Sequence, residues 1–125
     1  MIGSLLHASI GTRPDITQAV GVISKYCEKP TEVHLTAVKR IMRYLKGTLD
    51  HKLTFNASDC PLIGYADANW AADLDNRRST SGNVLCLANG PISWTSKRQS
   101  VVATSTTEAE YIAIFHCILL RLNAY

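Results

Sequence analysis

The dipeptide Asn89-Gly90 stands between two runs of residues that favour β-strands, Val84–Ala88 and Ile92–Ser96. Both residues tolerate positive φ angles, so Asn-Gly between β-rich runs is the strongest short-range signal for a hairpin. Pro91 follows the turn, and a proline is tolerated there at the first residue or the edge of a strand. The pattern therefore predicts an antiparallel hairpin in the second half of the chain.

Other segments around this hairpin complete the expected unit. Two strand candidates precede it, a short one at His51–Phe55 and a more strongly apolar one at Leu62–Ala66. The segment Ser105–Leu122 is typical of a helix, with Ser105 and Glu108 forming a capping box at its start. This order predicts an α+β fold in which a helix lies over a mostly antiparallel sheet.

The first half of the chain has helical periodicity instead. Ile2–Ile10 predicts a short helix that ends near Gly11. A second helix is expected to follow, with Thr12 as its N-cap and Pro14 in its first turn. The apolar positions of this second helix are Ile16, Ala19, Val20, Ile23 and Cys27.

A third helix is expected after Pro30, capped by Thr31 and ending at Gly47. Its apolar stripe is Val38, Ile41, Met42 and Leu45. Its basic residues are Lys39, Arg40, Arg43 and Lys46. Basic helix faces are mostly solvated, although nucleic-acid contact is the alternative. We expect a helical segment at 1–50, a link at 51–61 and a second domain at 62–125.

The cysteine spacing and the net charge restrict the possible functions of the chain. Cys27, Cys60, Cys86 and Cys117 form no C-x-x-C pair and the histidines are scattered, so we expect neither a zinc site nor a disulfide framework. Reduced, buried thiols suggest an intracellular protein, in cytoplasm or nucleus. The formal net charge of +3 is compatible with a polyanion partner. No apolar run is long enough to span a bilayer, so no membrane partner is expected.

Two acidic residues adjoin apolar elements. Asp67 directly follows the apolar strand candidate, and Glu110 shares a helix face with Ala113, Ile114 and Cys117. A buried carboxylate is costly unless it is paired or binds a metal ion. If the helix crosses the strand, the two carboxylates can converge into an oxygen-rich site for a hard cation such as Mg²⁺. On spacing alone, a strand end and a solvated loop explain Asp67 as well.

Longer motifs favour the metal interpretation. The stretches GYADANWAADLDNRRSTSG (64–82) and GPISWTSKRQSVVATSTTEAEY (90–111) closely resemble the ribonuclease H domain of Ty1/copia-type retrotransposon polyproteins. Upstream, TRPDITQAVGVISKY (12–26) and HLTAVKRIMRYLKGT (34–48) resemble the segment that joins the reverse transcriptase to that domain. The resemblance runs from about Gly3 to Ala113. It implies a partial ribonuclease H-like domain of three antiparallel strands and the first helix, preceded by a small helical segment.

The resemblance also implies an activity and its residues. The parent enzyme hydrolyses RNA in RNA–DNA hybrids by two-metal catalysis with Mg²⁺ and needs no small-molecule cofactor. Asp67 matches the first catalytic carboxylate and Glu110 the one on the first helix, so both are expected to be metal ligands. Glu108 then corresponds to the capping residue.

Further positions match contacts to the hybrid. Thr106 and Thr107 match residues at the minor groove, where a hydroxyl can bond to a 2′-OH. Lys97, Arg98 and Gln99 follow the hairpin and are candidates for phosphate contact, with a solvated turn as the alternative.

Several other polar and aromatic residues receive a structural interpretation. Local ion pairs or turn bonds explain the acids and arginines after the first strand, and packing explains the tryptophans. These residues are Asp73, Asp75, Arg77, Arg78, Trp70 and Trp94.

Only part of the parent site is matched. The third and fourth carboxylates of a ribonuclease H site lie beyond its first helix, and the sequence ends at Tyr125. We therefore expect a truncated, inactive domain. The alternatives are a non-catalytic remnant that binds nucleic acid and a relic without selected function.

Overall fold

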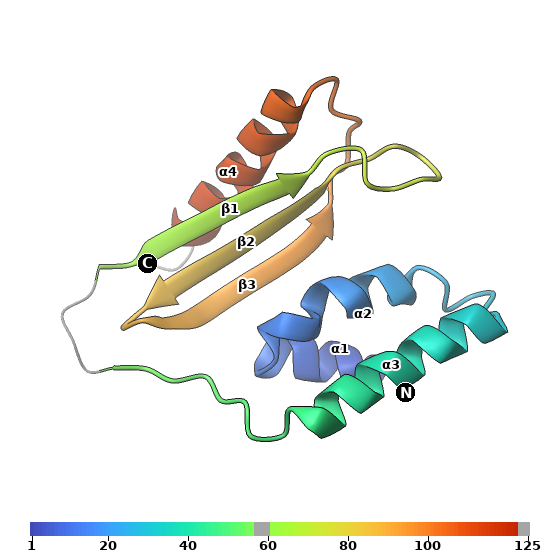
Figure 1. The fold of residues 1–125 in the computed structure, drawn as a ribbon. Coiled ribbons are helices and arrows are strands. Elements are labelled where there is room, and N and C mark those ends of the chain that lie inside the picture. The colour runs from blue at the N-terminus through green and yellow to red at the C-terminus, as the bar shows by residue number, and fades with distance from the viewer. Residues whose placement is uncertain (57–60, 123–125) are drawn as a thin grey trace. The chain divides into compact units, whose positions relative to one another are not determined.

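The computed structural model describes residues 1–56 and 61–122, and the chain divides into two compact units, Met1–Leu53 and Thr54–Tyr125 (Figure 1). The first unit is helical and the second contains a sheet and one helix. We describe each unit by itself. The predicted link at 51–61 includes residues 57–60, which lie outside the described part of the chain.

The first unit consists of three α-helices and a short 3₁₀ turn. The helices are α1 (Ile2–Gly11), α2 (Thr17–Ser24) and α3 (Glu32–Gly47), and the turn is η1 (Pro14–Ile16). The predicted ends of the first and third helices are therefore confirmed. The buried core of this unit is Leu5, Ile16, Val20, Ile23, Val38 and Ile41. These residues recur at helical spacing because each helix must bury one apolar face.

The second helix starts and ends differently from the prediction. Thr12 is not its N-cap, because the amide of Thr12 donates to Ala8 O at 3.0 Å and closes α1, while η1 precedes α2. The helix ends at Ser24, whose hydroxyl donates to Gly21 O at 2.8 Å. Cys27 therefore lies beyond the helix and is exposed, which contradicts its place in the apolar stripe.

Thr31 caps the third helix as predicted, and it does so as part of a capping box. The side chain of Thr31 accepts from the backbone of His34, and Thr31 N donates to His34 Nδ1 at 3.1 Å. Here a histidine takes the role that glutamate or glutamine usually plays. Val38 and Ile41 are buried as predicted, but Met42 is 47% exposed.

The second unit is a three-stranded antiparallel sheet with one helix on it (Figure 1). Its strands β1 (Ile63–Asn69), β2 (Thr80–Leu87) and β3 (Gly90–Arg98) lie in the order β1-β2-β3, and α4 (Thr106–Leu122) packs on β1 and β2. The predicted α+β arrangement is confirmed.

The short strand expected at His51–Phe55 does not form. Beside it, Asn56 N donates to Ala88 O at 2.8 Å, but no ladder of bonds extends along the segment.

The hairpin is present, but its turn differs from the prediction by one residue. The residues with positive φ are Ala88 (50°) and Asn89 (61°), and Gly90 is already the first residue of β3. A Cβ atom on Gly90 would meet the ring of Phe55 and would lie 2.7 Å from Thr54 O. Gly90 is therefore required by close approach of this preceding segment rather than by its backbone angle.

Replacing Gly90 with alanine should lower the free energy of unfolding of the second unit by about 1–3 kcal/mol, because the new methyl group overlaps Phe55 and Thr54. Gly82→Ala is the matched control, since a Cβ there meets nothing closer than Asp67 O at 4.0 Å. Urea unfolding followed by tryptophan fluorescence reports on this unit alone, because Trp70 and Trp94 both lie in it. Equal effects of the two substitutions would contradict the role given to Gly90.

Candidate nucleic-acid and metal site

Asp67 follows the apolar run but lies inside β1 rather than at the end of the strand. The strand continues to Asn69 because its pairing with β2 continues, with Asp67 opposite Gly82 and Asn69 opposite Thr80. Asp67 is exposed. A Cβ on Gly64 would lie 2.9 Å from Cys117 Sγ, so Gly64 faces α4, and strand alternation places Asp67 on the opposite face of the sheet.

Glu110 lies in the second turn of α4 and reaches the strand that carries Asp67. Its Oε1 accepts a hydrogen bond from Ala68 N at 3.3 Å, across 42 positions of sequence, and its side chain is half-buried. Helix α4 therefore crosses β1, and the carboxylate of Glu110 contacts Ala68, the residue that follows Asp67. Both groups offer oxygen ligands of the type that hard divalent cations prefer.

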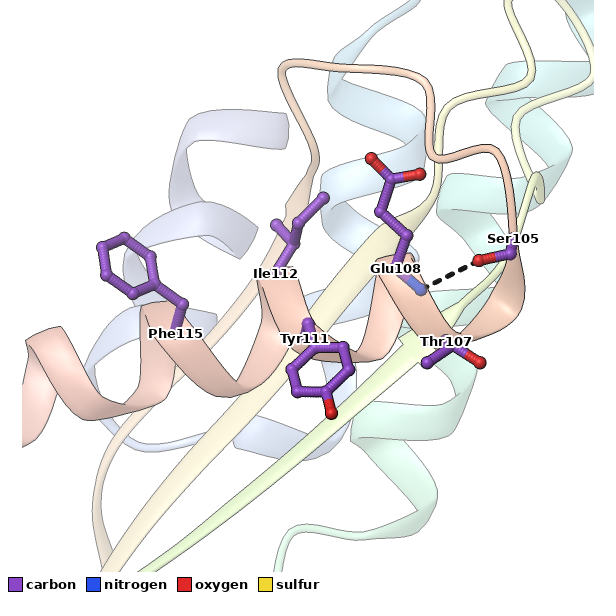
Figure 2. A pocket seen from close by; sticks show the side chains of 6 residues that line it. All are labelled: Ser105, Thr107, Glu108, Tyr111, Ile112 and Phe115. Carbon is purple, nitrogen blue, oxygen red and sulfur yellow. Dashed lines mark hydrogen bonds between the residues drawn. The ribbon is translucent and has the colours of Figure 1, made fainter.

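Glu108 is used by the start of the helix. Its backbone N donates to Ser105 Oγ at 3.1 Å (Figure 2), and its Oε2 accepts from both the amide and the hydroxyl of Thr104, each at 2.7 Å. The bonds from the Thr104 amide and hydroxyl lower the pKa of Glu108. The carboxylate reaches one residue further back than in the standard capping box. Of the two glutamates, Glu110 is thus the one directed at β1.

Thr106 and Thr107 occupy the first turn of α4, and both are exposed. Beside them the outer surface of the helix carries an open hollow of about 470 Å³. Figure 2 shows its lining side chains, which are Ser105, Thr107, Glu108, Tyr111, Ile112 and Phe115. Thr107 is the one predicted site residue in this lining, which contains neither Asp67 nor Glu110.

The register of the sheet brings the predicted basic residues to the same end as Asp67. Gly82 in β2 pairs with Asp67 in β1 and with Ser96 in β3. Its neighbour Ser81 pairs with Ala68 in β1 and with Lys97 in β3. Lys97 is exposed. This end of the sheet therefore combines exposed acidic and basic side chains.

The two residues after Lys97 are engaged within the protein. Arg98 Nη1 forms an ion pair of 2.8 Å with Asp73 Oδ2. Gln99 is 2% exposed, and its Nε2 donates to Ser81 Oγ at 2.8 Å and to Ala109 O at 2.9 Å. The suggestion that Gln99 contacts phosphate is therefore wrong, because the chain turns beneath α4 immediately after β3.

The loop between β1 and β2 is held by local bonds, as expected. Asp73 accepts at its main-chain oxygen from Arg77 N (2.7 Å) and at Oδ1 from Asp75 N (3.1 Å), and its amide donates to Arg78 O at 3.2 Å. Asp73 thus organises the loop. Trp70 acts as an anchor, since its Nε1 donates to Ala103 O at 3.2 Å.

The described part of the chain contains no cluster of metal-binding side chains and no helix able to cross a membrane. Across 1–56 and 61–122, no three or more histidine, cysteine, aspartate or glutamate side chains lie close enough to hold a metal ion. Cys117 is buried as expected, Cys86 is half-buried, Cys27 is exposed and Cys60 lies outside the described residues. Within the same ranges no helix has the length and apolarity needed to cross a bilayer.

Comparison with known proteins identifies several relatives. The chain is 54% identical over 112 residues to the retrovirus-related Pol polyprotein from transposon TNT 1-94 of Nicotiana tabacum, a match that covers 90% of the chain and 8% of the polyprotein. It is 45% identical over 115 residues to the Pol polyprotein from transposon RE1 of Arabidopsis thaliana, again 8% of that protein. The chain thus spans under a tenth of these polyproteins.

A relative of similar length is also known. Secreted RxLR effector protein 161 of Plasmopara viticola is 45% identical over 114 residues, which is 90% of the chain and 80% of that protein. No family model matches the chain. No solved structure matches it significantly either.

Proposed function

We propose that this chain, which belongs to the family of retrovirus-related Pol polyproteins from copia-like transposons, contains the end of a reverse transcriptase followed by the front of a ribonuclease H-like domain. The order of a helical unit and then an antiparallel sheet with one helix supports this assignment. In the parent protein the second unit would take part in hydrolysis of RNA within RNA–DNA hybrids.

One observation carries the proposal: Glu110 Oε1 bonds to Ala68 N at 3.3 Å, beside Asp67. These acids are the two that the motif resemblance assigns to metal binding, and they come from elements far apart in sequence. A packing contact without chemistry would not require an acid on a helix face that otherwise carries Ala113 and Cys117.

The donor set fits Mg²⁺ in type. Asp67 and Glu110 would hold the cation through carboxylate oxygens, and the bound metal would supply an activated water and stabilise the leaving oxygen. Ala68 N fixes the orientation of Glu110 by occupying one of its oxygens. Thr106, Thr107 and Lys97 would position the hybrid through its 2′-hydroxyls and phosphates.

The same donor set is incomplete for efficient catalysis by the isolated chain. Two carboxylates leave most of an octahedral coordination shell to water, and a weakly held metal positions the attacking water poorly. We therefore propose that the chain by itself does not cleave hybrids efficiently.

Incubation of the purified chain with a labelled RNA–DNA hybrid in Mg²⁺ or Mn²⁺ tests this proposal. We expect no cleavage above that of the Asp67→Asn variant. Cleavage that Asp67→Asn abolishes would contradict the proposed inactivity, while supporting Asp67 as a ligand.

The second candidate function is that of a non-catalytic remnant that binds RNA–DNA hybrids. The exposed side chain of Lys97, at the same end of the sheet as Asp67, favours it. Mobility shift of the hybrid should weaken by about threefold to tenfold in Lys97→Ala, because one phosphate contact is lost. The matched control is Arg121→Ala, which removes one positive charge from the last turn of α4. Equal losses would indicate nonspecific attraction, and no shift at all would leave a relic without nucleic-acid affinity.

A further inference from the structure

The positive charge of the chain is concentrated in its helical unit. Met1–Leu53 contains eight lysines and arginines against four aspartates and glutamates, a formal net charge of +4. Residues 54–125 contain five basic residues against six acidic ones, a net charge of −1. Half of the basic residues of the first unit lie on α3, namely Lys39, Arg40, Arg43 and Lys46. A polyanion is therefore attracted to the first unit rather than to the sheet.

These four residues form one basic stripe along α3. Lys39, Arg43 and Lys46 follow one another at spacings of four and three residues, so they share one face of the helix. Arg40 lies on the flank of this face, three residues before Arg43. All four residues are exposed, and they lie on the side away from the buried core positions of the helix. At a rise of 1.5 Å per residue the basic stripe extends about 10 Å along the helix.

The basic stripe has no acidic partners. The one acidic residue of α3 is Glu32, in the first turn of the helix and about two turns before Lys39. Across 1–56 and 61–122 none of the four basic side chains forms an ion pair, whereas Arg13 of the same unit is paired with Asp15 at 2.7 Å. Covering four cations with neutral protein would remove their water without supplying counter-charges. The stripe therefore stays at a surface in a longer polyprotein as well.

Helix stability alone does not explain the basic stripe. Lys46 lies in the last turn, where a cation complements the helix dipole. Lys39, Arg40 and Arg43 precede that turn and gain little from the dipole. Like charges three or four residues apart destabilise a helix, so the stripe has a cost in the free chain that a bound anion would relieve.

The aromatic side chains of α3 favour a double-stranded partner over a single strand. Single-stranded nucleic acids are held by aromatic rings on which their bases stack. The hydroxyl of Tyr44 donates to Asp15 at 2.8 Å, and its ring lies 5.6 Å from the guanidinium of Arg13. The ring of His34 is stacked on Tyr26, with 4.2 Å between the centroids. Both rings are thus already engaged, and the stripe offers positive charge without a stacking surface.

An anionic bilayer is a poorer partner for the same surface. A helix that binds a bilayer surface buries its apolar face at the boundary of the acyl chains. The apolar face of α3 is packed into the core of the helical unit through Val38 and Ile41. A bilayer would therefore contact the charges of the stripe alone.

We propose that the basic stripe of α3 binds the phosphate backbone of double-stranded nucleic acid without reading its sequence. Each arginine can donate two parallel hydrogen bonds to a phosphate, and the lysines act as point charges. A DNA duplex presents about six phosphate charges in 10 Å of its axis, so the contacts need no fixed register. This surface goes beyond the proposed function, because it belongs to the first unit and uses neither Asp67 nor Glu110.

Fluorescence anisotropy of a short labelled DNA duplex, titrated with the full chain at low salt, tests this surface. The double variant Lys39→Gln/Arg43→Gln should raise the dissociation constant about tenfold to a hundredfold, because two phosphate contacts are lost. The matched control Lys29→Gln/Lys52→Gln removes the same charge from exposed positions of the same unit outside α3. The control should raise the dissociation constant less than about threefold. Equal losses in the two variants, or no binding by the parent, would overturn the proposal.

Salt dependence and folding provide separate checks. Four phosphate contacts predict that the logarithm of the binding constant falls with the logarithm of salt concentration at a slope of about −3.6, and the double variant should reduce this slope by about 2. An unchanged slope would contradict phosphate contact by these residues. Circular dichroism in urea should show the double variant at least as stable as the parent, because repulsion within α3 is reduced. The variant Lys39→Arg/Arg43→Lys keeps both charges and should retain most of the affinity.

Other ligands separate this surface from the proposed function. The double variant should weaken binding of a DNA duplex and of an RNA–DNA hybrid by similar factors, because the stripe contacts phosphate alone. Weakening by Lys97→Ala alone would overturn the stripe and leave the hybrid-binding candidate standing. Weakening by the double variant alone would support the stripe and count against Lys97. Tighter binding of a single strand than of the duplex, or binding of phosphatidylserine vesicles in place of the duplex, would also overturn the proposal.

Discussion

Replacing Gln99 with alanine is expected to lower the free energy of unfolding of the sheet-and-helix unit by about 3 kcal/mol. Gln99 is 2% exposed, and its amide nitrogen joins β2 to α4 by donating to Ser81 Oγ at 2.8 Å and Ala109 O at 2.9 Å. Truncation leaves both acceptors without this donor and opens a cavity beneath the helix. Both penalties result from the same substitution, and both lower the stability of this unit.

A second variant separates these penalties. Gln99→Met fills the same space without the donor, so we expect a loss of about 1–2 kcal/mol. Ser100→Ala, at the exposed neighbouring residue, should change stability by less than about 0.5 kcal/mol. The measurement is again urea unfolding followed by the fluorescence of Trp70 and Trp94. A Gln99→Ala effect as small as that of Ser100→Ala would show that Gln99 does not link the helix to the sheet.

Gln99 also shows where sequence reasoning fails. The run Lys97-Arg98-Gln99 is polar throughout and is expected to follow the hairpin, so a phosphate contact or a solvated turn is expected there. In the structure the surface beneath α4 is itself polar: Ser79, Ser81, Asn83 and Gln99 are all buried. Members of this layer bond to one another and to the helix backbone, although within the described part of the chain Gln99 Oε1 is buried without a hydrogen-bond partner. Local sequence does not reveal that network, since its partners come from separate elements.

The hairpin was predictable for a local reason, and its turn was not. Alternating β-favouring residues around Asn89 are sufficient to predict two paired strands. The position of the turn depends on register, and a tertiary contact places Gly90 against Thr54 and Phe55. Ala88 consequently takes a positive φ angle of 50°, which a residue with a Cβ rarely adopts.

The candidate site was predictable only through motif resemblance. Periodicity places Glu110 on the apolar face of α4, but its contact with Ala68 depends on where the helix crosses the sheet. Helix and strand are separated by the whole hairpin, so no local pattern fixes that crossing. The exposure of Ile114, which shares the predicted face, likewise depends on the crossing: α4 buries Ala109, Ala113 and Cys117 instead.

The largest effect expected in the helical unit is at Asp15. Its carboxylate accepts from Arg13 Nη2 at 2.7 Å and from the Tyr44 hydroxyl at 2.8 Å, while Arg13 Nη2 also donates to Thr48 Oγ1 at 2.6 Å. These bonds tie the turn between α1 and α2 to the end of α3. We expect Asp15→Asn to lower the free energy of unfolding of this unit by about 1–2 kcal/mol. The matched control is Asp50→Asn, an exposed acid in the same unit, which should have little effect.

The pH dependence gives Asp15 an independent signature. The hydrogen bond from Arg13 lowers the pKa of Asp15 from its ordinary 3.8 to about 2. The unfolded chain then binds a proton more readily than the folded one, so stability rises with pH in this range. The contribution of Asp15 is complete above about pH 3.8 and disappears as the pH falls through about 2. Urea unfolding followed by the methyl resonances of Val20 and Ile41 should show this loss in the parent and in Asp50→Asn. In Asp15→Asn the dependence between these pH values should be much weaker, and an unchanged slope would assign the acid sensitivity to other carboxylates.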